Sequence, residues 1–475
     1  MIIMNCFTKL HYRQGYIDLL EKIYKEYNFS DGIDKSFFEF IPPDEEIIMN
    51  DDVEGLLNYM NNGTYDLTTL LEKCCLRGAI NCFKLLKDDF NVEITKKCLD
   101  NSFKGGNQYI INECLEEQNP DKETMEAVIE SHNIDNFKKL YDLNTGFQIK
   151  SLVVEKNLHA FIYYLNRTND LDTCFLFSPY FNIPSFCEYL YANGANMSSM
   201  STDGDSTLDI AVLTNHTETA SFLISKGIEM DEKAFYYAVS SNSTVMVELL
   251  VSHGADVNFR EKNTGFSMLH IACLNDNIKA VEILISHGIN INDNENDKGL
   301  TPLMIVSILN YKEIAEFLLS HGASINMQDK NGEIALHHAI MHDCKEFTEF
   351  IANKIEFLAY HDRYQVVLGE FGNFSDLIEI LVSNGAYVNA KNKDLHSPLH
   401  LAAFTFDCKI AEILISHGAI VNSLNIYGVT PLDFVIFRIK SKDGNDPDVL
   451  EELNKVRRCL ISHGGKTSLQ MKKKM

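Results

Sequence analysis

The sequence predicts an all-α, helical-repeat solenoid, with short β-hairpin fingers between helix pairs in its second half and a degenerate-repeat helical region before them. Three observations predict this fold. A phrase that ends a helix recurs, a phrase that begins a helix recurs, and the apolar residues between them follow a helical period. The 475 residues are therefore expected to form one continuous stack, although length alone suggests about three compact domains.

The helix-ending phrase is Ser-His-Gly-Ala and its near copies. Its glycine can adopt the left-handed conformation that closes a helix. Successive copies are 33, 27, 34, 34, 63, 33 and 46 residues apart. The glycines are Gly194, Gly227, Gly254, Gly288, Gly322, Gly385, Gly418 and Gly464. A histidine, which favours a helix C-terminus, precedes five of them, at His253, His287, His321, His417 and His463.

The helix-starting phrase is Thr-Pro-Leu-His and its variants. In one copy Thr301 suits the N-cap, Pro302 suits the first helical position, and Leu303 begins an apolar stripe. Equivalent residues are Leu208, Phe235, Leu269, Leu336, Leu399 and Leu432, and the phrase ends in His270, His337 and His400. An alternating stretch and a turn glycine precede most copies, which predicts a hairpin-like finger. In one finger Leu395 replaces this glycine, so that finger must turn differently.

Two of the intervals between successive closing glycines, of 63 and 46 residues, are longer than the usual repeat of about 33. Residues 342–351 copy the spacing of residues 310–319, so a normal repeat is expected to end near Lys354. Residues 365–385 align with residues 234–254, so the longest interval is expected to hold a degenerate repeat rather than a foreign loop. Residues 441–445 are expected to be a loop before a final helix that Asp446 caps and Pro447 opens.

These phrases resemble the ankyrin repeat, whose pattern is Gly-x-Thr-Pro-Leu-His followed by Gly-Ala-x-Val-Asn. The resemblance covers about residues 195–465. Met304, Asp209 and Asp433 replace the histidine of the phrase, and the units that end at Gly254 and Gly385 lack the phrase. We therefore expect about eight ankyrin repeats in residues 191–465, two of them degenerate, and a basic tail in residues 466–475.

Residues 1–190 lack fingers but keep a recurring second-helix pattern, with 24 to 30 residues between copies. The copies begin at Val53, Ile80, Ile110, Ile134, Leu158 and Ile183. They predict helix pairs back to about residue 50, after a helical start in the first 40 or so residues. Residues 74–83, 119–123, 131–135 and 181–185 resemble an uncharacterised domain that precedes ankyrin repeats in a large family of protozoan proteins. That resemblance supports the architecture and implies no activity.

Charge and composition restrict the classes of binding partner and the location that are expected. Forty-two basic and 67 acidic residues give a net charge of −25, which repels phosphate backbones, so no nucleic acid is expected; the alternative predicts salt-dependent binding to DNA or RNA. Residues 1–190 carry −13, residues 191–437 carry −17 and residues 438–475 carry +5, so basic or mixed protein surfaces are favoured. No apolar run approaches the roughly 18 residues of a membrane span. Twelve cysteines without a Cys-x-x-Cys pair indicate reduced thiols and a cytoplasmic location, with the nucleus left open.

No motif indicates catalysis, a cofactor or a metal. His337, His338 and His342 lack the further ligands that zinc needs, and the pair Cys74 and Cys75 is interpreted as core packing. Asparagines four residues after a closing glycine are interpreted as turn-stabilising; they are Asn258, Asn292, Asn326, Asn389 and Asn422.

Because no catalytic motif is found, the chain is predicted not to be an enzyme. The rival hypothesis is an enzyme hidden in residues 1–190, although no constellation of residues points to one.

The ankyrin resemblance implies a non-catalytic intracellular scaffold or adaptor that binds protein partners through a concave surface of finger tips and first helices. Finger positions that depart from the repeat are the binding candidates: Arg260, Glu261, Lys262, Asp293, Glu295, Gln328, Lys330, Lys391 and Lys393. The alternative is a membrane–cytoskeleton linker, since some ankyrin-repeat proteins bind spectrin. The sequence names neither the partner nor the oligomeric state.

Overall fold

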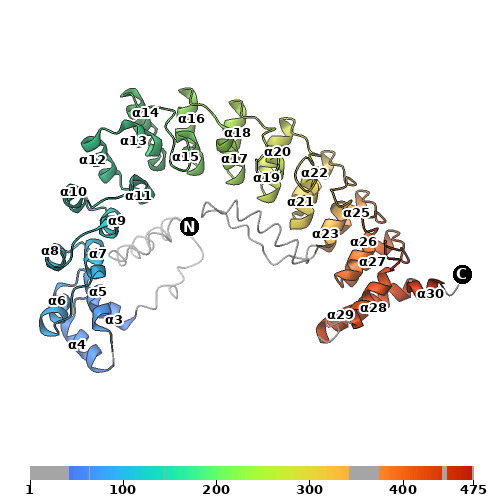
Figure 1. Ribbon diagram of the computed structural model, residues 1–475, viewed down its shortest axis with the longest axis horizontal. Helices are drawn as coiled ribbons and strands as arrows, with labels where there is room; N and C mark the ends of the chain where they lie inside the picture. The colour runs from blue at the N-terminus through green and yellow to red at the C-terminus, as the bar shows by residue number, and fades with distance from the viewer. Residues whose placement is uncertain (1–41, 64, 144, 342–373, 441–446, 473–475) are drawn as a thin grey trace, which may run out of the picture. The chain divides into compact units, whose positions relative to one another are not determined.

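The computed structural model describes residues 42–63, 65–143, 145–341, 374–440 and 447–472 (Figure 1). The chain divides into two compact units, Met1–Asn196 and Met197–Met475. Helices account for the regular structure of the described residues, and no β-strand is present among them. The all-α prediction is confirmed. The helical start expected in the first 40 residues and the helix expected at residues 342–351 lie outside the described residues.

The first unit consists of short helices joined by brief turns. The helices are α3 (Pro43–Met49), α4 (Val53–Asn61), α5 (Leu67–Arg77), α6 (Ile80–Lys84), the π-helix η3 (Leu85–Asp89), α7 (Lys96–Gly105), α8 (Gln108–Glu117), α9 (Lys122–Ser131), α10 (Ile134–Asp142), α11 (Ile149–Val154), α12 (Leu158–Thr168), α13 (Leu171–Phe177), the 3₁₀ helix η4 (Ser178–Phe181) and α14 (Pro184–Ala192). The predicted second helices are α4, α6, α8, α10, α12 and α14, and each begins within two residues of its predicted start.

Phenylalanines fill the core of the first unit. Five of them are fully buried: Phe83, Phe103, Phe137, Phe161 and Phe175. They come from both helices of the pairs, so each helix buries one apolar face between its neighbours. Polar side chains close the helix ends between successive pairs. The Asn157 side chain caps α12 by accepting from the Ala160 N–H at 3.1 Å and donates to the Ile129 carbonyl oxygen of α9 at 2.9 Å.

The second unit repeats one motif, a first helix followed by a second helix. The helices are α15 (Thr207–Leu213), α16 (Thr217–Ser225), α17 (Glu232–Ser240), α18 (Thr244–Ser252), α19 (Met268–Leu274), α20 (Ile278–Ser286), α21 (Pro302–Leu309), α22 (Lys312–Ser320), α23 (Ala335–Ile340), α25 (Ser375–Ser383), α26 (Pro398–Phe404), α27 (Cys408–Ser416), α28 (Pro431–Lys440), α29 (Pro447–Ser462) and α30 (Ser468–Lys472). First helices contact the next first helix and second helices contact the next second helix, so they form two rows (Figure 1).

The leucine of the helix-starting phrase anchors each first helix. Leu208, Leu269, Leu303, Leu336, Leu399 and Leu432 are all at most 3% exposed. Thr301 caps α21 by accepting from the Met304 N–H at 3.2 Å, and Pro302 is the first helical residue, as predicted. Removing such a leucine would leave a cavity and cost about 2–5 kcal/mol.

The closing glycines and their histidines have the predicted conformations. Gly288 has a φ of +82°, in the left-handed region. The Nδ1 atom of His287 lies 2.8 Å from the carbonyl oxygen of Ile283 in the last turn of α20. The same contact recurs at His253, His321, His417 and His463. These five histidines therefore cap helices, in agreement with the sequence.

The fingers differ from the prediction. In the described residues they are turns with two isolated antiparallel bridges, Met200 with Ser206 and Arg260 with Ser267, rather than β-hairpins. Within a finger one backbone bond closes the loop, as between the Asp329 N–H and the Glu333 carbonyl oxygen, while the N–H groups of Asn331 and Glu333 bond to a side chain, so no ladder of paired strands forms.

The long interval before Gly385 also differs from the prediction. Helix α25 contacts α22, α23 and α27, so it is the second helix of the repeat that α23 begins. Lys312 of α22 forms a 2.6 Å ion pair with Asp376 of α25, which confirms that these second helices are neighbours. Among the described residues, α25 therefore directly follows α22 in the row of second helices, and α23 contacts α26, so no separate degenerate repeat is seen between them there. The sequence of α25 fits the second-helix position of a repeat, and the helix takes that position in the repeat that α23 begins. Residues 342–373 lie outside the described residues.

None of the helices in the described ranges combines the length and the apolar character that crossing a lipid bilayer requires.

Candidate partner-binding surface

A buried histidine fixes the base of each regular finger. The Nε2 atom of His270 donates to the Leu300 carbonyl oxygen at 2.8 Å, and its Nδ1 atom accepts from the Ser267 N–H at 3.2 Å. His270 is fully buried, and burial lowers its pKa to about 4. His337 and His400 make the same kinds of contact, and burial lowers their pKa values to about 4 as well. The three imidazoles are neutral at pH 7 and join one finger to the next.

A short polar side chain closes the tip of each finger from within. The Oδ1 atom of Asn296 accepts from the N–H groups of Lys298 and Leu300, at 3.2 and 2.9 Å. Asp329, Asn392 and Asn425 do the same three residues before Gly332, Leu395 and Gly428. Because the side chain supplies the missing acceptor, the tip keeps one conformation. This explains how the finger with Leu395, at a φ of +60°, turns without glycine.

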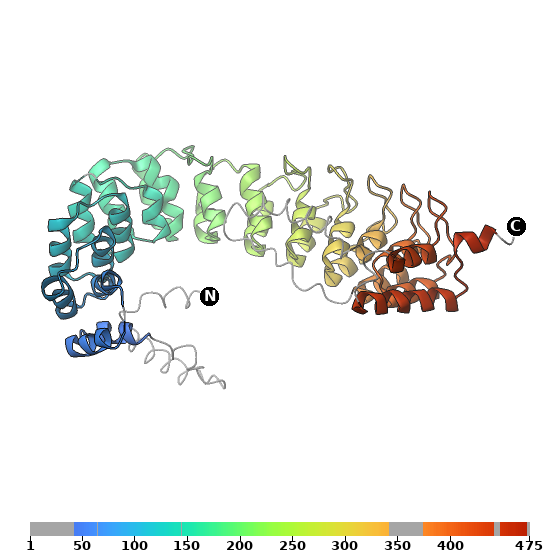
Figure 2. The same cartoon turned by 60° about the horizontal axis from the view of Figure 1, so that its bottom comes forward.

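Hydrogen bonds between backbones tie successive fingers together. The Lys330 N–H donates to the Lys298 carbonyl oxygen at 3.0 Å, and the Lys393 N–H donates to the Asn331 carbonyl oxygen at 2.9 Å. The Ile426 N–H continues the series by donating to the Asp394 carbonyl oxygen at 3.0 Å. Figure 2 shows these loops side by side along one edge of the second unit. The four finger tips of residues 293–428 thus form one supported rim.

The asparagines that the sequence assigns to turns do more than stabilise their own turn. Asn326 donates to the Gly385 carbonyl oxygen at 3.0 Å and accepts from the Tyr387 N–H at 2.7 Å. Asn389 and Asn422 make the same pair of bonds with the next helix-closing loop, and Asn292 accepts from the Ser324 N–H. Each of these side chains therefore holds two successive repeats together. The role is structural, as predicted, but it links neighbouring repeats and is not confined to the asparagine's own turn.

Two of the nine candidate residues are buried. Asp293 is 2% exposed and forms a 2.7 Å ion pair with Nη1 of Arg260, whose guanidinium also lies 3.2 Å from Glu295. Glu261 is 8% exposed and accepts from the N–H groups of Asn263 and Thr264. The carboxylates of Asp293 and Glu261 therefore serve the fingers themselves, and Arg260 is half-buried between two carboxylates.

The other candidates lie on the exposed rim. Lys330 and Lys391 each donate from Nζ to a carbonyl oxygen of a neighbouring finger, at Asp297 and Leu424. Lys262 lies 3.7 Å from Glu232, and Gln328, Lys393 and Glu295 are exposed. The structure brings Lys391 and Lys393 together on one finger, whereas Lys262 lies on a different finger.

Apolar side chains at the last two finger tips were missed by the sequence reasoning. Tyr427 is 75% exposed and Ile426 is 57% exposed, with Leu424 and Leu395 also exposed. We call Lys391, Lys393, Leu395, Leu424, Ile426 and Tyr427 the C-terminal finger patch. Earlier fingers carry polar residues at the positions of Ile426 and Tyr427, namely Asp297 with Lys298 and Lys330 with Asn331. That contrast is present in the sequence, but the predicted candidates are all charged or polar residues.

Family models match most of the described chain. A model described as a domain of unknown function (DUF3447) matches residues 90–164. A model of three ankyrin repeats matches residues 174–261, 229–295 and 269–360, and a single ankyrin-repeat model matches residues 394–426. No curated protein matches the chain. The repeated helix pairs, their capped ends and these matches agree: the chain is an ankyrin-repeat protein in which a domain of unknown function precedes the repeats.

Proposed function

We propose that this protein is a non-catalytic adaptor that binds a protein partner through its finger rim, with the C-terminal finger patch as the main contact. Ankyrin repeats indicate a protein–protein interaction role. The observation that carries the proposal is the exposure of Ile426 and Tyr427 at finger tips where the other regular fingers are polar. Exposed aromatic and aliphatic side chains that neighbour one another favour an interaction site.

The support beneath the patch favours tight binding. Asn425 and Asn392 fix the two finger tips, and the Ile426 N–H donates to the Asp394 carbonyl oxygen between them. A preformed surface loses little conformational entropy when a partner binds, so more of the contact energy becomes affinity.

The charges of the patch indicate the chemistry of the partner. Lys391 donates from Nζ to the Leu424 carbonyl oxygen, and Lys393 is on the same finger as Leu395, in a protein whose net charge is −25. A partner segment with apolar side chains next to carboxylates would complement this patch. Basic segments would instead be attracted by the acidic remainder of the repeats.

The histidines and several carboxylates of the fingers support a binding role rather than catalysis. His270 and His400 are buried and bonded to backbone carbonyl oxygens, and Asp329 accepts from backbone N–H groups and His338. The ten cysteines in the described residues are free thiols, which fits a reducing compartment such as the cytoplasm.

The test is capture of a partner by the full-length protein, followed by titration of the purified partner against variants. Ile426→Ala combined with Tyr427→Ala should weaken binding by tenfold or more, since buried hot-spot residues typically contribute about 2 kcal/mol or more. Tyr189→Ala is the matched control, because Tyr189 on α14 is 56% exposed but belongs to the first unit. Unchanged affinity in the double variant would contradict the assignment of the patch.

A further inference from the structure

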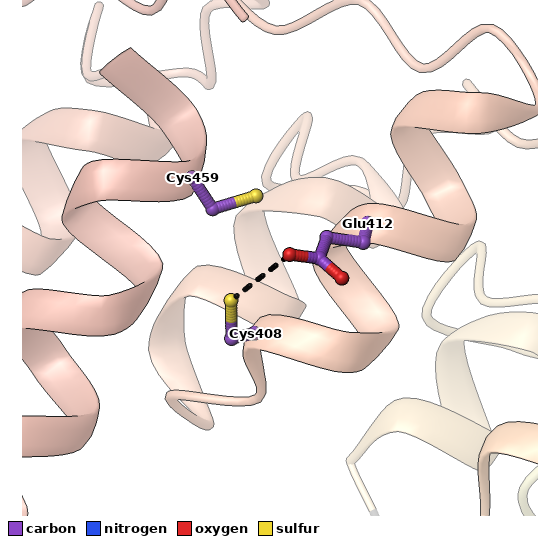
Figure 3. A group of neighbouring side chains, drawn as sticks. All are labelled: Cys408, Glu412 and Cys459. Atoms are coloured by element: carbon purple, nitrogen blue, oxygen red, sulfur yellow. Dashed lines mark hydrogen bonds between the residues drawn. The ribbon is translucent and has the colours of Figure 1, made fainter. Parts of the chain in front are cut away.

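Two thiols and a carboxylate converge between the last two second helices. Cys408 begins α27, Glu412 lies one turn later on the same helix, and Cys459 lies on α29 (Figure 3). The two Sγ atoms and a carboxylate oxygen all lie within 4.8 Å of one another. The Cys408 thiol donates to a Glu412 carboxylate oxygen at 3.6 Å.

The repeat explains the carboxylate but not the thiols. A glutamate stands at the position of Glu412 in the other second helices α18, α20, α22 and α25; these residues are Glu248, Glu282, Glu316 and Glu379. The position of Cys408 holds Thr244, Ile278, Lys312 and Ser375 in the same helices. The position of Cys459, five residues before the closing glycine, holds Leu249, Ile283, Phe317, Ile380 and Ile413. The two cysteines are therefore specific to this place, and contact between α27 and α29 brings them together.

We propose that Cys408, Glu412 and Cys459 bind a divalent cation that prefers thiolate ligands, with Zn²⁺ as the best fit. Zinc takes two sulfur ligands and one carboxylate oxygen in tetrahedral sites, and a water molecule would be the fourth ligand. With Zn–S bonds of about 2.3 Å, tetrahedral geometry requires the two sulfurs to lie about 3.8 Å apart. The three ligand atoms lie within 4.8 Å of one another, so the ion would draw the two sulfurs closer together.

The protonation state of the two thiols sets the proton balance of the binding step. Burial, with the neighbouring Cys459 and Glu412, raises the pKa of Cys408 to about 12. Burial and Glu412 also raise the pKa of Cys459, while the Cys408 thiol lowers it. Without a metal both thiols are therefore protonated at pH 7. Binding of M²⁺ forms two M–S bonds and releases two protons to solvent, so charge and atoms balance.

Access and position suit a structural ion. Glu412 is exposed and Cys408 is half-buried, so an ion can reach the site from solvent, while Cys459 is buried behind them. The ion would join α27, the last regular second helix, to helix α29. Because the ion binds only the folded arrangement, it should raise the thermal unfolding temperature.

A second cluster, formed by Asp329, Glu333 and His338, does not carry the same inference. Asp329 accepts from the N–H groups of Asn331 and Glu333 and contacts Nε2 of His338 at 3.2 Å, and Glu333 accepts from the Asn392 side chain. Its polar atoms are therefore engaged in closing a finger.

The experiment is titration of reduced, metal-free, full-length protein with Co²⁺, followed by displacement with Zn²⁺. We expect one equivalent of Co²⁺ to give thiolate-to-metal charge-transfer absorption, and Zn²⁺ to abolish it. Cys408→Ser and Cys459→Ser should remove the absorption, and Glu412→Gln should weaken binding by about tenfold or more. Cys408 and Glu412 are not fully buried, so these two variants should keep the circular dichroism of the parent even if the Cys459 variant loses stability.

Two controls locate the ion. Glu379→Gln removes the equivalent carboxylate of α25, where Ser375 replaces the cysteine, and should leave binding unchanged. Cys98→Ser removes a buried thiol of the first unit and should also leave it unchanged. Absence of thiolate absorption in the reduced parent would overturn the proposal. Absorption that survives Cys408→Ser but disappears in Cys98→Ser would overturn it too, because the ion would then lie elsewhere.

Discussion

The imidazole of His270 donates a 2.8 Å hydrogen bond to the backbone carbonyl oxygen of Leu300 in the following finger. A single buried side chain thus caps its own helix, through the Ser267 N–H, and holds the next repeat. Stability in a repeat protein is approximately a sum of contributions within repeats and between neighbours, and this contact belongs to the second kind.

His270→Ala should destabilise the protein by about 2–4 kcal/mol at pH 7.5. The substitution leaves the Ser267 N–H without its side-chain acceptor, removes one of the two donors to the Leu300 carbonyl oxygen (Asn296 is the other) and opens a cavity. Equilibrium unfolding in urea measures the change. The control is His287→Ala, which removes an exposed helix cap and should cost about 0.3–1 kcal/mol. Equal losses in the two variants would refute the role given to His270.

The stability difference between the parent and His270→Ala should shrink as the pH falls. Burial lowers the pKa of His270 to about 4 in the folded state, below its unfolded value. The unfolded state therefore binds the proton first, and the stabilisation present above about pH 6.5 is lost as the pH falls toward 4. At pH 5 the difference should be smaller by roughly 2 kcal/mol. A difference independent of pH between 7.5 and 5 would show that His270 is not buried as a neutral base.

Asp209→Asn should show the opposite pH dependence. Burial raises the pKa of Asp209 to about 7, and Asp231 contributes in the same direction. The folded state therefore favours the protonated carboxyl, and its stabilisation is lost as the pH rises from about 4 through 7. Asparagine keeps an acceptor for the Ser206 N–H without the charge. Relative to the parent, the free energy of unfolding of the variant should rise by about 2–3 kcal/mol between pH 5 and pH 8, measured by denaturant midpoints. A gain that is larger at pH 5 would contradict this pKa direction.

Asn326→Ala should destabilise the protein by about 1–3 kcal/mol. The side chain makes two hydrogen bonds to the loop at Gly385 and Tyr387, which couple the repeat of α22 to that of α25. Thermal unfolding followed by circular dichroism measures the loss. Asn263→Ala, in an exposed finger position, should change stability by less than about 0.5 kcal/mol. If both variants behave alike, the bridge between the repeats contributes nothing measurable.

Local chemistry was readable from the sequence. The helix starts at Val53, Ile80 and Leu158, the left-handed Gly288 and the histidine caps all follow from residue type and spacing. Each of these features depends on residues within one or two turns, where backbone preferences dominate.

Contacts between residues of different repeats could not be predicted from the sequence in the same way. Asp293 looked available for a partner, because nothing in its own finger shows that Arg260, 33 residues earlier, pairs with it. Helix α25 was assigned to a separate repeat, because its contact with α22 spans 64 residues of chain. Cys408 and Cys459 are 51 residues apart and match no ligand spacing, so the sequence predicts no metal there. Such pairings depend on the stacking of the repeats.

Photocrosslinking from the finger patch tests the binding role most directly. A photoreactive phenylalanine analogue is placed at position 427 of the full-length protein, and in a second preparation at position 189, where Tyr189 is similarly exposed. Irradiation in cell extract should give a discrete protein adduct from position 427 and none from position 189, and excess unlabelled parent protein should compete the adduct away. Adducts from position 189 alone, or equal uncompeted labelling from both positions, would contradict the binding role of the C-terminal finger patch.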